Sequence, residues 1–193
     1  MDDPVKEVPG VIHLLTQTPP SIQRHTILTH FSPTASFTHP FCRVESWFPA
    51  SQTLILFIYR WYKILSPRIL LSVDSVAFDK PNKLLYVGIS QRFAIWAIPL
   101  HRADVKLVTV LKLVREGPGT NEGRWLIQSQ NDLYQTDQFV RFVIPVVGPL
   151  FVWVWQAFAT VVCVLCAVVF WPVTILEESL QSRLSRDLGK RRG

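Results

Sequence analysis

The sequence predicts an α+β domain followed by one transmembrane α-helix. Apolar side chains recur at helical spacing up to about residue 65, and residues from Arg68 onward alternate with a period of two. Residues 142–176 contain no Asp, Glu, Lys, Arg or His. Helices followed by a run of antiparallel strands are the order of α+β folds. We therefore divide the chain into a folded domain at 1–140, a hydrophobic segment at 142–176 and a basic tail at 177–193.

The hydrophobic segment is long enough to cross a bilayer. Its core, residues 150–171, also lacks Gly and Pro. At about 1.5 Å per residue this core extends over roughly 33 Å, against a hydrocarbon thickness of about 30 Å. Trp153 and Trp155 lie toward one end and Trp171 toward the other, and indole rings favour the membrane–water interface. A buried helix of a soluble domain is the alternative, but such helices rarely run this far without a charge.

The folded domain is expected to begin with helices. Asp3 followed by Pro4 is typical of a helix start, and Pro9 is expected to restart the helix. Further segments follow from proline positions and apolar spacing. They are a second helix from about 19 to 31, a Pro-rich connection at 32–49 and a buried helix at 51–65.

Four strands are expected after the helices, at about 68–79, 83–98, 104–115 and 123–133. Turn residues separate them at 81–82 and 117–119. In the second strand one face would carry Leu85, Val87, Ile89 and Gln91. Since the opposite face is not purely polar either, we expect both faces of the sheet to be covered.

Charge and motifs exclude several function classes. The formal net charge is +6, but the only basic cluster is at 190–192 in the tail. We therefore expect anionic lipid headgroups as a partner and no nucleic acid. The five histidines include no H-x-x-x-H pair, and the chain has neither a P-loop nor a G-x-G-x-x-G sequence. We expect no metal and no cofactor.

Cysteine usage fits a domain without disulfides. Cys42 is the only cysteine outside the hydrophobic segment, so no disulfide framework can form there. Cys163 and Cys166 have the spacing of a redox or zinc pair. Within a membrane segment, small packing residues are the better interpretation.

Several stretches of the chain resemble one family. They are DPVKEVP at 3–9, FSPTASFTHPFCRV at 31–44, RWYKILSP at 60–67, VAFD at 76–79, SQNDLYQ at 129–135 and WP at 171–172. Together they resemble the fungal SigF-like proteins, which have a nuclear-transport-factor-2-like (NTF2-like) domain and a C-terminal transmembrane segment. The resemblance implies a cone, with N-terminal helices packed in a curved antiparallel sheet. It implies no particular activity, because the same fold hosts ketosteroid isomerases, dehydratases, cyclases and non-catalytic binding domains.

Candidate site residues follow from the implied cone. Isomerases of this fold place an acid and a hydrogen-bonding group in an apolar cavity, where burial shifts the pKa of the acid toward catalysis. Asp74 and His39 are the candidate catalytic residues, and Tyr62, Tyr86 and Gln91 are candidate ligand contacts. A solvent-facing carboxylate and a structural imidazole are the plainer interpretations of Asp74 and His39.

Three functions remain open at this point. The first is a membrane-anchored, non-catalytic binding module whose cone holds a lipid-like or other hydrophobic small molecule. The second is an enzyme of the isomerase or dehydratase type. The third is an interaction scaffold that forms a homodimer through its sheet, as this fold commonly does.

The sequence gives conflicting indications of membrane orientation. One C-terminal span, with no secretory signal before the domain, is typical of a tail-anchored protein of the endoplasmic reticulum with a cytosolic domain. The tail carries five basic residues, whereas only Arg124 and Arg141 lie close to the other end of the span. That asymmetry favours a cytosolic tail. We expect the tail-anchored arrangement.

Overall fold

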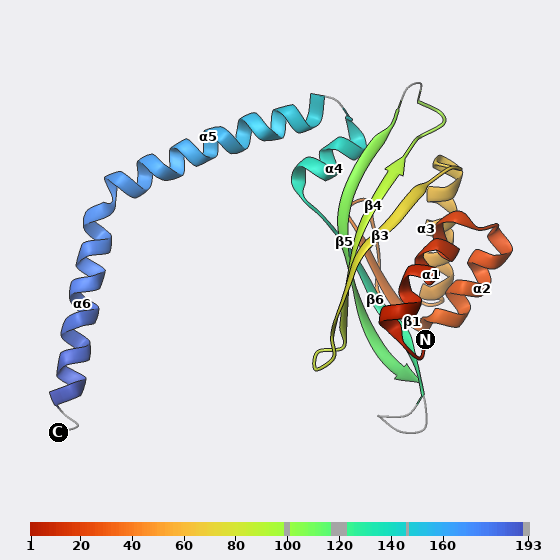
Figure 1. Cartoon of the computed structure of the whole chain (residues 1–193), viewed down its shortest axis with the longest axis horizontal. Coiled ribbons are helices and arrows are strands. Elements are labelled where there is room, and N and C mark those ends of the chain that lie inside the picture. The colour runs from red at the N-terminus through yellow and green to blue at the C-terminus, as the bar shows by residue number, and fades with distance from the viewer. Residues whose placement is uncertain (99–100, 117–122, 146, 191–193) are drawn as a thin grey trace. The chain divides into compact units, whose positions relative to one another are not determined.

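The computed structural model describes residues 1–98, 101–116, 123–145 and 147–190 (Figure 1). The chain divides into two compact units, Met1–Pro149 and Leu150–Gly193. The turn predicted at 117–119 and the last basic residues of the tail, 191–192, lie outside the described residues.

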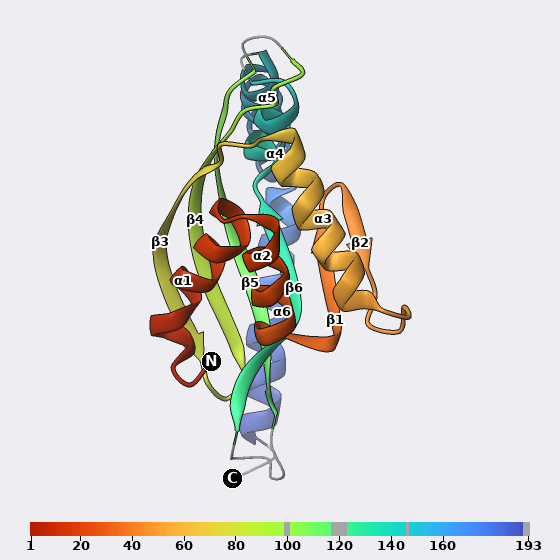
Figure 2. The same ribbon diagram turned by 90° about the vertical axis from the view of Figure 1, so that its right-hand side faces the viewer.

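A six-stranded sheet and the helices packed against it form the first unit. The helices that precede or interrupt the strands are α1 (Pro4–Gln17), α2 (Pro20–His30) and α3 (Ser51–Leu65). The strands are β1 (Phe31–His39), β2 (Cys42–Val44), β3 (Leu70–Asp79), β4 (Leu84–Phe93), β5 (Ala103–Glu116) and β6 (Arg124–Tyr134), followed by helix α4 (Thr136–Val143). Figure 2 shows α1, α2 and α3 lying along one face of the curved sheet. The predicted α+β architecture is confirmed.

The sheet is mixed, where a wholly antiparallel one was expected. Its strand order is β2-β1-β6-β5-β4-β3, and β1 pairs parallel with β6. Strands β1 and β2 form within the segment predicted to be a Pro-rich connection. Pro33 lies where the register between β1 and β6 is irregular, and Pro40 lies in the turn between β1 and β2. At both places the sheet tolerates the missing N–H of proline.

The N-terminal helices form largely as the capping residues predict. Asp3 is the N-cap of α1, and its carboxylate accepts a hydrogen bond from the Lys6 N–H. Glu7 Oε1 accepts from the backbone N–H groups of Asp2 and Asp3, which gives these two donors a partner at the start of the helix. Contrary to the prediction of a restart, α1 continues through Pro9. Helix α3 has the predicted bounds.

The hydrophobic core lies between the helices and the concave face of the sheet. In β4, Leu85, Val87 and Ile89 are buried on that face, whereas Tyr86 and Arg92 face outward. This is the division that the period of two predicts. The strand ends at Phe93, five residues before its predicted end.

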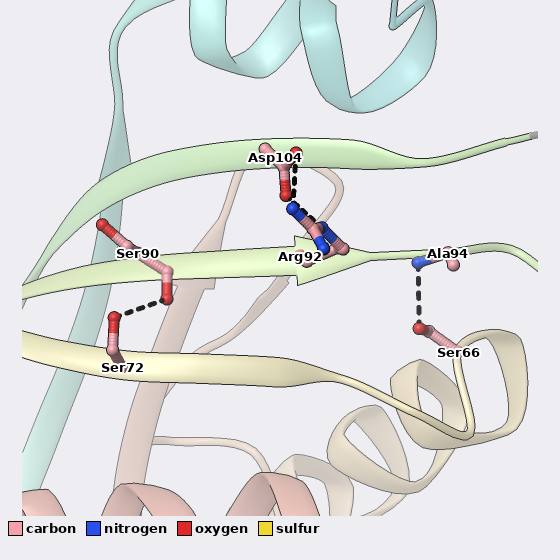
Figure 3. Close-up of polar contacts among 6 residues, drawn as sticks. All are labelled: Ser66, Ser72, Ser90, Arg92, Ala94 and Asp104. Carbon is pink, nitrogen blue, oxygen red and sulfur yellow. Dashed lines mark hydrogen bonds and ion pairs between the residues drawn. The ribbon is translucent and has the colours of Figure 1, made fainter.

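The outer face of the sheet is held by polar contacts between strands (Figure 3). Arg92 on β4 forms a bidentate ion pair with Asp104 on β5, at 2.6 and 3.2 Å. Just beyond β4, the Ala94 N–H donates to the Ser66 Oγ at 3.1 Å. This last bond ties the C-terminal end of α3 to the end of β4.

The second unit contains most of the hydrophobic helix. Among the described residues one helix, α5 (Val147–Val169), is long and apolar enough to cross a membrane, with a mean hydropathy of 2.2. Helix α6 (Trp171–Lys190) follows after a break at Phe170. Trp153 and Trp155 lie in α5, and Trp171 begins α6.

Replacing a residue on the concave face should destabilise the domain far more than replacing its outward neighbour. Leu85 is fully buried and Tyr86 is 39% exposed. We expect Leu85→Ala to lower the free energy of unfolding by about 2–5 kcal/mol. Tyr86→Ala should change it by less than about 1 kcal/mol. Thermal unfolding of the detergent-solubilised chain, followed by near-UV circular dichroism, measures both. Equal effects would contradict the assignment of the two faces.

Candidate functional site

A cavity of about 80 Å³ lies inside the cone. A single water needs roughly 10–15 Å³ on this measure, so the cavity has room for a small ligand. Its walls come from α1, α3, α4 and five strands. The apolar lining residues are Val8, Val11, Ile12, Leu15, Phe37, Ile69, Leu71, Ile89, Phe93, Leu107, Leu111, Ile127 and Phe142. The polar lining residues belong mainly to two clusters.

The first polar cluster centres on His39, at the end of β1. Its Nδ1 accepts hydrogen bonds from the Phe41 N–H at 3.3 Å and from the Tyr62 hydroxyl at 3.0 Å. The ring proton is therefore on Nε2, which lies 3.3 Å from the Tyr134 hydroxyl. Burial lowers the pKa of His39 to about 4, so the ring is neutral at pH 7.

Tyr134 is the point where this cluster meets the cavity. Its hydroxyl oxygen accepts from His39 Nε2 and, at 3.2 Å, from Gln91 Nε2. A phenol also has one O–H to donate. Because the oxygen acts as the acceptor in both of these hydrogen bonds, the hydroxyl proton is available to a molecule in the cavity. Burial and the nearby charge of Asp132 raise the pKa of Tyr134, which keeps the phenol protonated.

The second polar cluster holds the carboxyl group of Asp132. Its Oδ1 accepts from the Thr109 hydroxyl at 2.7 Å and from Gln130 Nε2 at 3.0 Å. Gln130 is itself held by the Tyr59 hydroxyl, which donates to its Oε1 at 2.8 Å. The second carboxylate oxygen, Oδ2, has only a longer contact of 3.2 Å to the same Gln130 nitrogen. This leaves Oδ2 with capacity to accept a proton.

The acidity of Asp132 is set by its surroundings. Burial raises its pKa to about 6, and the hydrogen bonds from Gln130 and Thr109 act in the opposite direction. Among the described residues it takes part in no ion pair. A carboxyl group with a pKa of about 6 is mostly ionised at neutral pH, yet basic enough to take a proton and return it. Tyr134 lies two residues further along β6 on the same face, roughly 6.6 Å away along the strand.

Three of the five sequence-predicted site residues lie in the cavity. His39, Tyr62 and Gln91 all line it. Tyr86 does not, because it is on the outward face of β4, opposite Ala77 and Val110. The fifth, Asp74, is also on the outside.

Asp74 lies at a β-bulge, on the outer face of β3. Val73 pairs with Ile89 and Ser75 pairs with Gly88, which leaves Asp74 as the extra residue. Its carboxylate accepts hydrogen bonds on the outer face from Ser72 at 3.0 Å and from Ser90 at 2.5 Å. These bonds, that of Ser90 first, hold the pKa of Asp74 below its usual value. A side chain in this position is not available to a ligand in the cone.

Five residues of the two polar clusters were not recognised as site residues in the sequence. They are Tyr59, Thr109, Gln130, Asp132 and Tyr134. Two patterns could have indicated them. Gln130, Asp132 and Tyr134 alternate along one face of β6, and Thr109 is the only polar residue in the inward apolar row of β5. A row of polar side chains on the concave face marks a site, because buried polar groups need partners.

No metal centre is indicated in the part of the chain that the structure describes. That part contains no group of three or more His, Cys, Asp or Glu side chains suited to hold an ion.

The domain is similar in fold to solved structures of other proteins. AclR, a putative hydroxylase from Streptomyces galilaeus, is 15% identical, with a TM-score of 0.50 over 83% of this chain and 95% of that chain. A putative SnoaL-like polyketide cyclase from Jannaschia sp. CCS1 is 15% identical, with a TM-score of 0.46 over 69% of this chain and 89% of that chain. At such identities the likeness shows the fold alone. That the fold is NTF2-like, as predicted, is shown by the match to a family profile.

The family of this chain follows from a match to a family profile. A family profile described as the SigF NTF2-like domain matches residues 1–174, and the chain belongs to this family. A search of curated proteins gave no match.

The buried carboxylate should make the domain less stable at neutral pH than its amide variant. The pKa of Asp132 is about 6 in the folded state and about 3.9 in the unfolded chain. Above pH 6 the native protein therefore carries the full cost of a desolvated charge. We expect Asp132→Asn to raise the free energy of unfolding at pH 7–8 by about 1–3 kcal/mol.

This advantage should shrink as pH falls through 6 and vanish near pH 4, where Asp132 is protonated in the folded state. Thermal unfolding between pH 4 and 8 measures it. Asp74→Asn is the matched control, because its folded-state pKa is lowered and its removal brings no gain. A pH-independent effect of Asp132→Asn would contradict the raised pKa.

Proposed function

We propose that the cone is an acid–base enzyme of the isomerase or dehydratase type. Its substrate would be a small, largely hydrophobic molecule that carries a carbonyl oxygen. One observation carries the proposal. A carboxyl group with a pKa of about 6, which has no ion pair among the described residues, faces an apolar cavity beside a phenol whose proton is available. Such a pair of groups is suited to remove a proton next to a carbonyl.

The proposed mechanism uses each member of the two clusters. Asp132 Oδ2 takes a proton from the carbon next to the carbonyl group, and Tyr134 donates a hydrogen bond to the oxygen on which negative charge develops. Asp132 then returns the proton to another carbon, which gives an isomer, or to a departing hydroxyl group, which gives a dehydrated product. His39 and Gln91 hold Tyr134, whereas Thr109 and Gln130 hold Asp132.

Non-catalytic binding of a hydrophobic or lipid-like molecule is the second candidate. It is favoured by the mainly apolar lining of the cavity. It is also favoured by the fact that Asp132 and Tyr134 are each already hydrogen-bonded within the protein. The two candidates share one site and differ in whether a proton moves.

Deuterium exchange separates the two candidates. The solubilised full chain is incubated in D₂O with a panel of cyclic ketones and enones, and incorporation next to the carbonyl group is followed by NMR. We expect Asp132→Asn to abolish the exchange. Tyr134→Phe should slow it by about 10²–10³-fold, as expected for the loss of one oxyanion donor.

Asp74→Asn is the matched control and should leave the exchange unchanged, because that carboxylate is outside the cone. Retention of ketones by the chain, measured by native mass spectrometry, without any exchange would favour the non-catalytic candidate. Exchange that survives Asp132→Asn would contradict the proposed base.

We also propose that α5 anchors the protein in a membrane as a single pass, with the cone in the cytosol and the endoplasmic reticulum as the membrane. The length and hydropathy of α5 support an anchor. Cys42 is a free thiol, which suits a reducing compartment.

A homodimer through the outer face of the sheet also stays a prediction. Tyr86, Val108 and Leu133 are exposed on that face. Light scattering of the solubilised chain tests it.

Extraction and protease protection test the anchor and its orientation. Alkaline carbonate should leave the full chain in the membrane pellet, whereas a chain with Val161→Lys and Leu165→Lys in α5 should be released, because charges at the bilayer centre are costly. In sealed microsomes, added protease should remove an N-terminal tag and spare a C-terminal one. The reverse pattern would place the cone in the lumen.

A further inference from the structure

A second, apolar hollow lies on the outside of the first unit. It has a volume of about 710 Å³ and lies between α3 and the β1–β2 hairpin. We call it the α3 groove. It is lined by Phe41, Cys42, Arg43, Val44, Leu54, Phe57, Ile58, Trp61, Tyr62, Leu65 and Phe142. Tyr62 and Phe142 line the inner cavity as well, so these two side chains separate the groove from the proposed active site.

The groove opens on a stripe of exposed apolar side chains along α3. Leu54, Phe57, Trp61 and Ile64 are 39–58% exposed, and their spacing of three, four and three residues places them on one side of the helix. The opposite side of α3, with Ile55 and Tyr59, packs against the core. Helix α3 is therefore apolar on both sides, although only one side has a partner within the described domain.

Aromatic residues next to α3 extend the stripe. Phe41, in the turn of the β1–β2 hairpin, is 50% exposed and lines the groove. Trp47 and Phe48, between β2 and α3, are 73% and 39% exposed, and their rings stack at 4.3 Å. Exposed Trp and Phe side chains on an apolar helix face are typical of segments that lie at the level of lipid headgroups.

The charges around the stripe are mainly positive. Helix α3 contains no Asp or Glu. Arg60 lies beside the stripe with its guanidinium 5.9 Å from the centre of the Phe57 ring, and its buried Nε has no hydrogen-bond partner in the described residues. Arg43 lines the groove and pairs with Glu45 at 2.5 Å. Arginines beside an apolar stripe match a surface of anionic lipid headgroups.

We propose that the exposed stripe of α3 and the β1–β2 hairpin rest on the surface of an anionic bilayer. This inference rests on the part of the proposed function that anchors the chain through α5. A tether in the same bilayer raises the effective concentration of the stripe at the lipid surface, so that even a weak affinity produces docking. In the docked state the α3 groove leads from the lipid surface to Tyr62 and Phe142. A hydrophobic ligand then reaches the cone from the bilayer without crossing bulk water.

Photocrosslinking of the full chain in liposomes tests the proposal. p-Benzoylphenylalanine replaces Phe57 or Trp61 in the stripe, and in matched controls it replaces Leu14 on α1 or Leu28 on α2, which are 37% and 53% exposed and lie outside the proposed homodimer face. The liposomes contain phosphatidylcholine with or without phosphatidylserine, and lipid adducts are quantified by mass spectrometry. We expect at least a fivefold higher lipid-adduct yield at 57 and 61 than at the control positions, and a further increase with phosphatidylserine.

Two further labelled chains make the outcomes decisive. A label at Val154, in α5, reports on the anchor independently of docking. If lipid adducts form at 154 but the yields at 57 and 61 are no higher than at the controls, docking is overturned and the anchor stays intact. An absence of adducts at 154 would count against the anchor instead. Protein–protein adducts at 61 in place of lipid adducts would assign the stripe to a second copy and overturn the proposal.

Arg60→Gln in the chain labelled at 57 should remove the increase with phosphatidylserine, and an unchanged increase would contradict the charge argument.

Discussion

The burial of one carboxyl group without a cation is the constraint on which the site depends. A buried carboxylate is strongly destabilising unless hydrogen bonds or protonation compensate for its lost hydration. For Asp132 the compensation comes from two strands and one helix, because Thr109 lies on β5, Gln130 on β6 and the supporting Tyr59 on α3. The compensation is partial, which is why the pKa remains raised. A carboxyl group held in this state lowers the stability of the domain, but it is able to exchange a proton with a bound molecule.

The parallel pairing of β1 with β6 connects the second polar cluster to the first. Thr38 pairs with Asn131 in this register, so that the next residue of β1, His39, reaches the end of β6 that carries Tyr134. The antiparallel neighbour β5 has no residue that could serve in the same way, since its inward row is apolar apart from Thr109. The strand that the sequence did not reveal is therefore the one that completes the site.

The difference between what the sequence predicted and what it did not has a physical origin. Elements defined by periodicity and capping, such as α3 and the inward row of β4, were predicted from local residues alone. For Asp74 the plainer interpretation, a solvent-facing carboxylate, is the one that the structure shows. Leu71 and Val73 point inward, so the alternation of β3 already turns Asp74 outward, and the bulge places Ser75 on the outer face as well. Strands β1 and β2 were missed because their prolines suggest a loop until the partner strand is known. His39, Tyr62 and Gln91 were identified as candidates through the cone that the family resemblance implies, and all three line the cavity.

Tyr62 links the two hollows of the domain physically. Its ring separates the α3 groove from the inner cavity, and its hydroxyl donates to His39 Nδ1 while lying 3.4 Å from Cys42 Sγ. The inner cavity, at about 80 Å³, holds only a small molecule, whereas the groove has about 710 Å³. A ligand that reaches from the cavity into the α3 groove has to pass Tyr62 or Phe142, because both side chains line both hollows. Displacing Tyr62 would break its hydrogen bond to His39 Nδ1, whereas the Phe41 N–H would still donate to that nitrogen and keep the ring proton on Nε2. The hydroxyl proton of Tyr134 therefore stays available when Tyr62 moves, so that the ligand length that the cone admits and the chemistry of the cone are set by different residues.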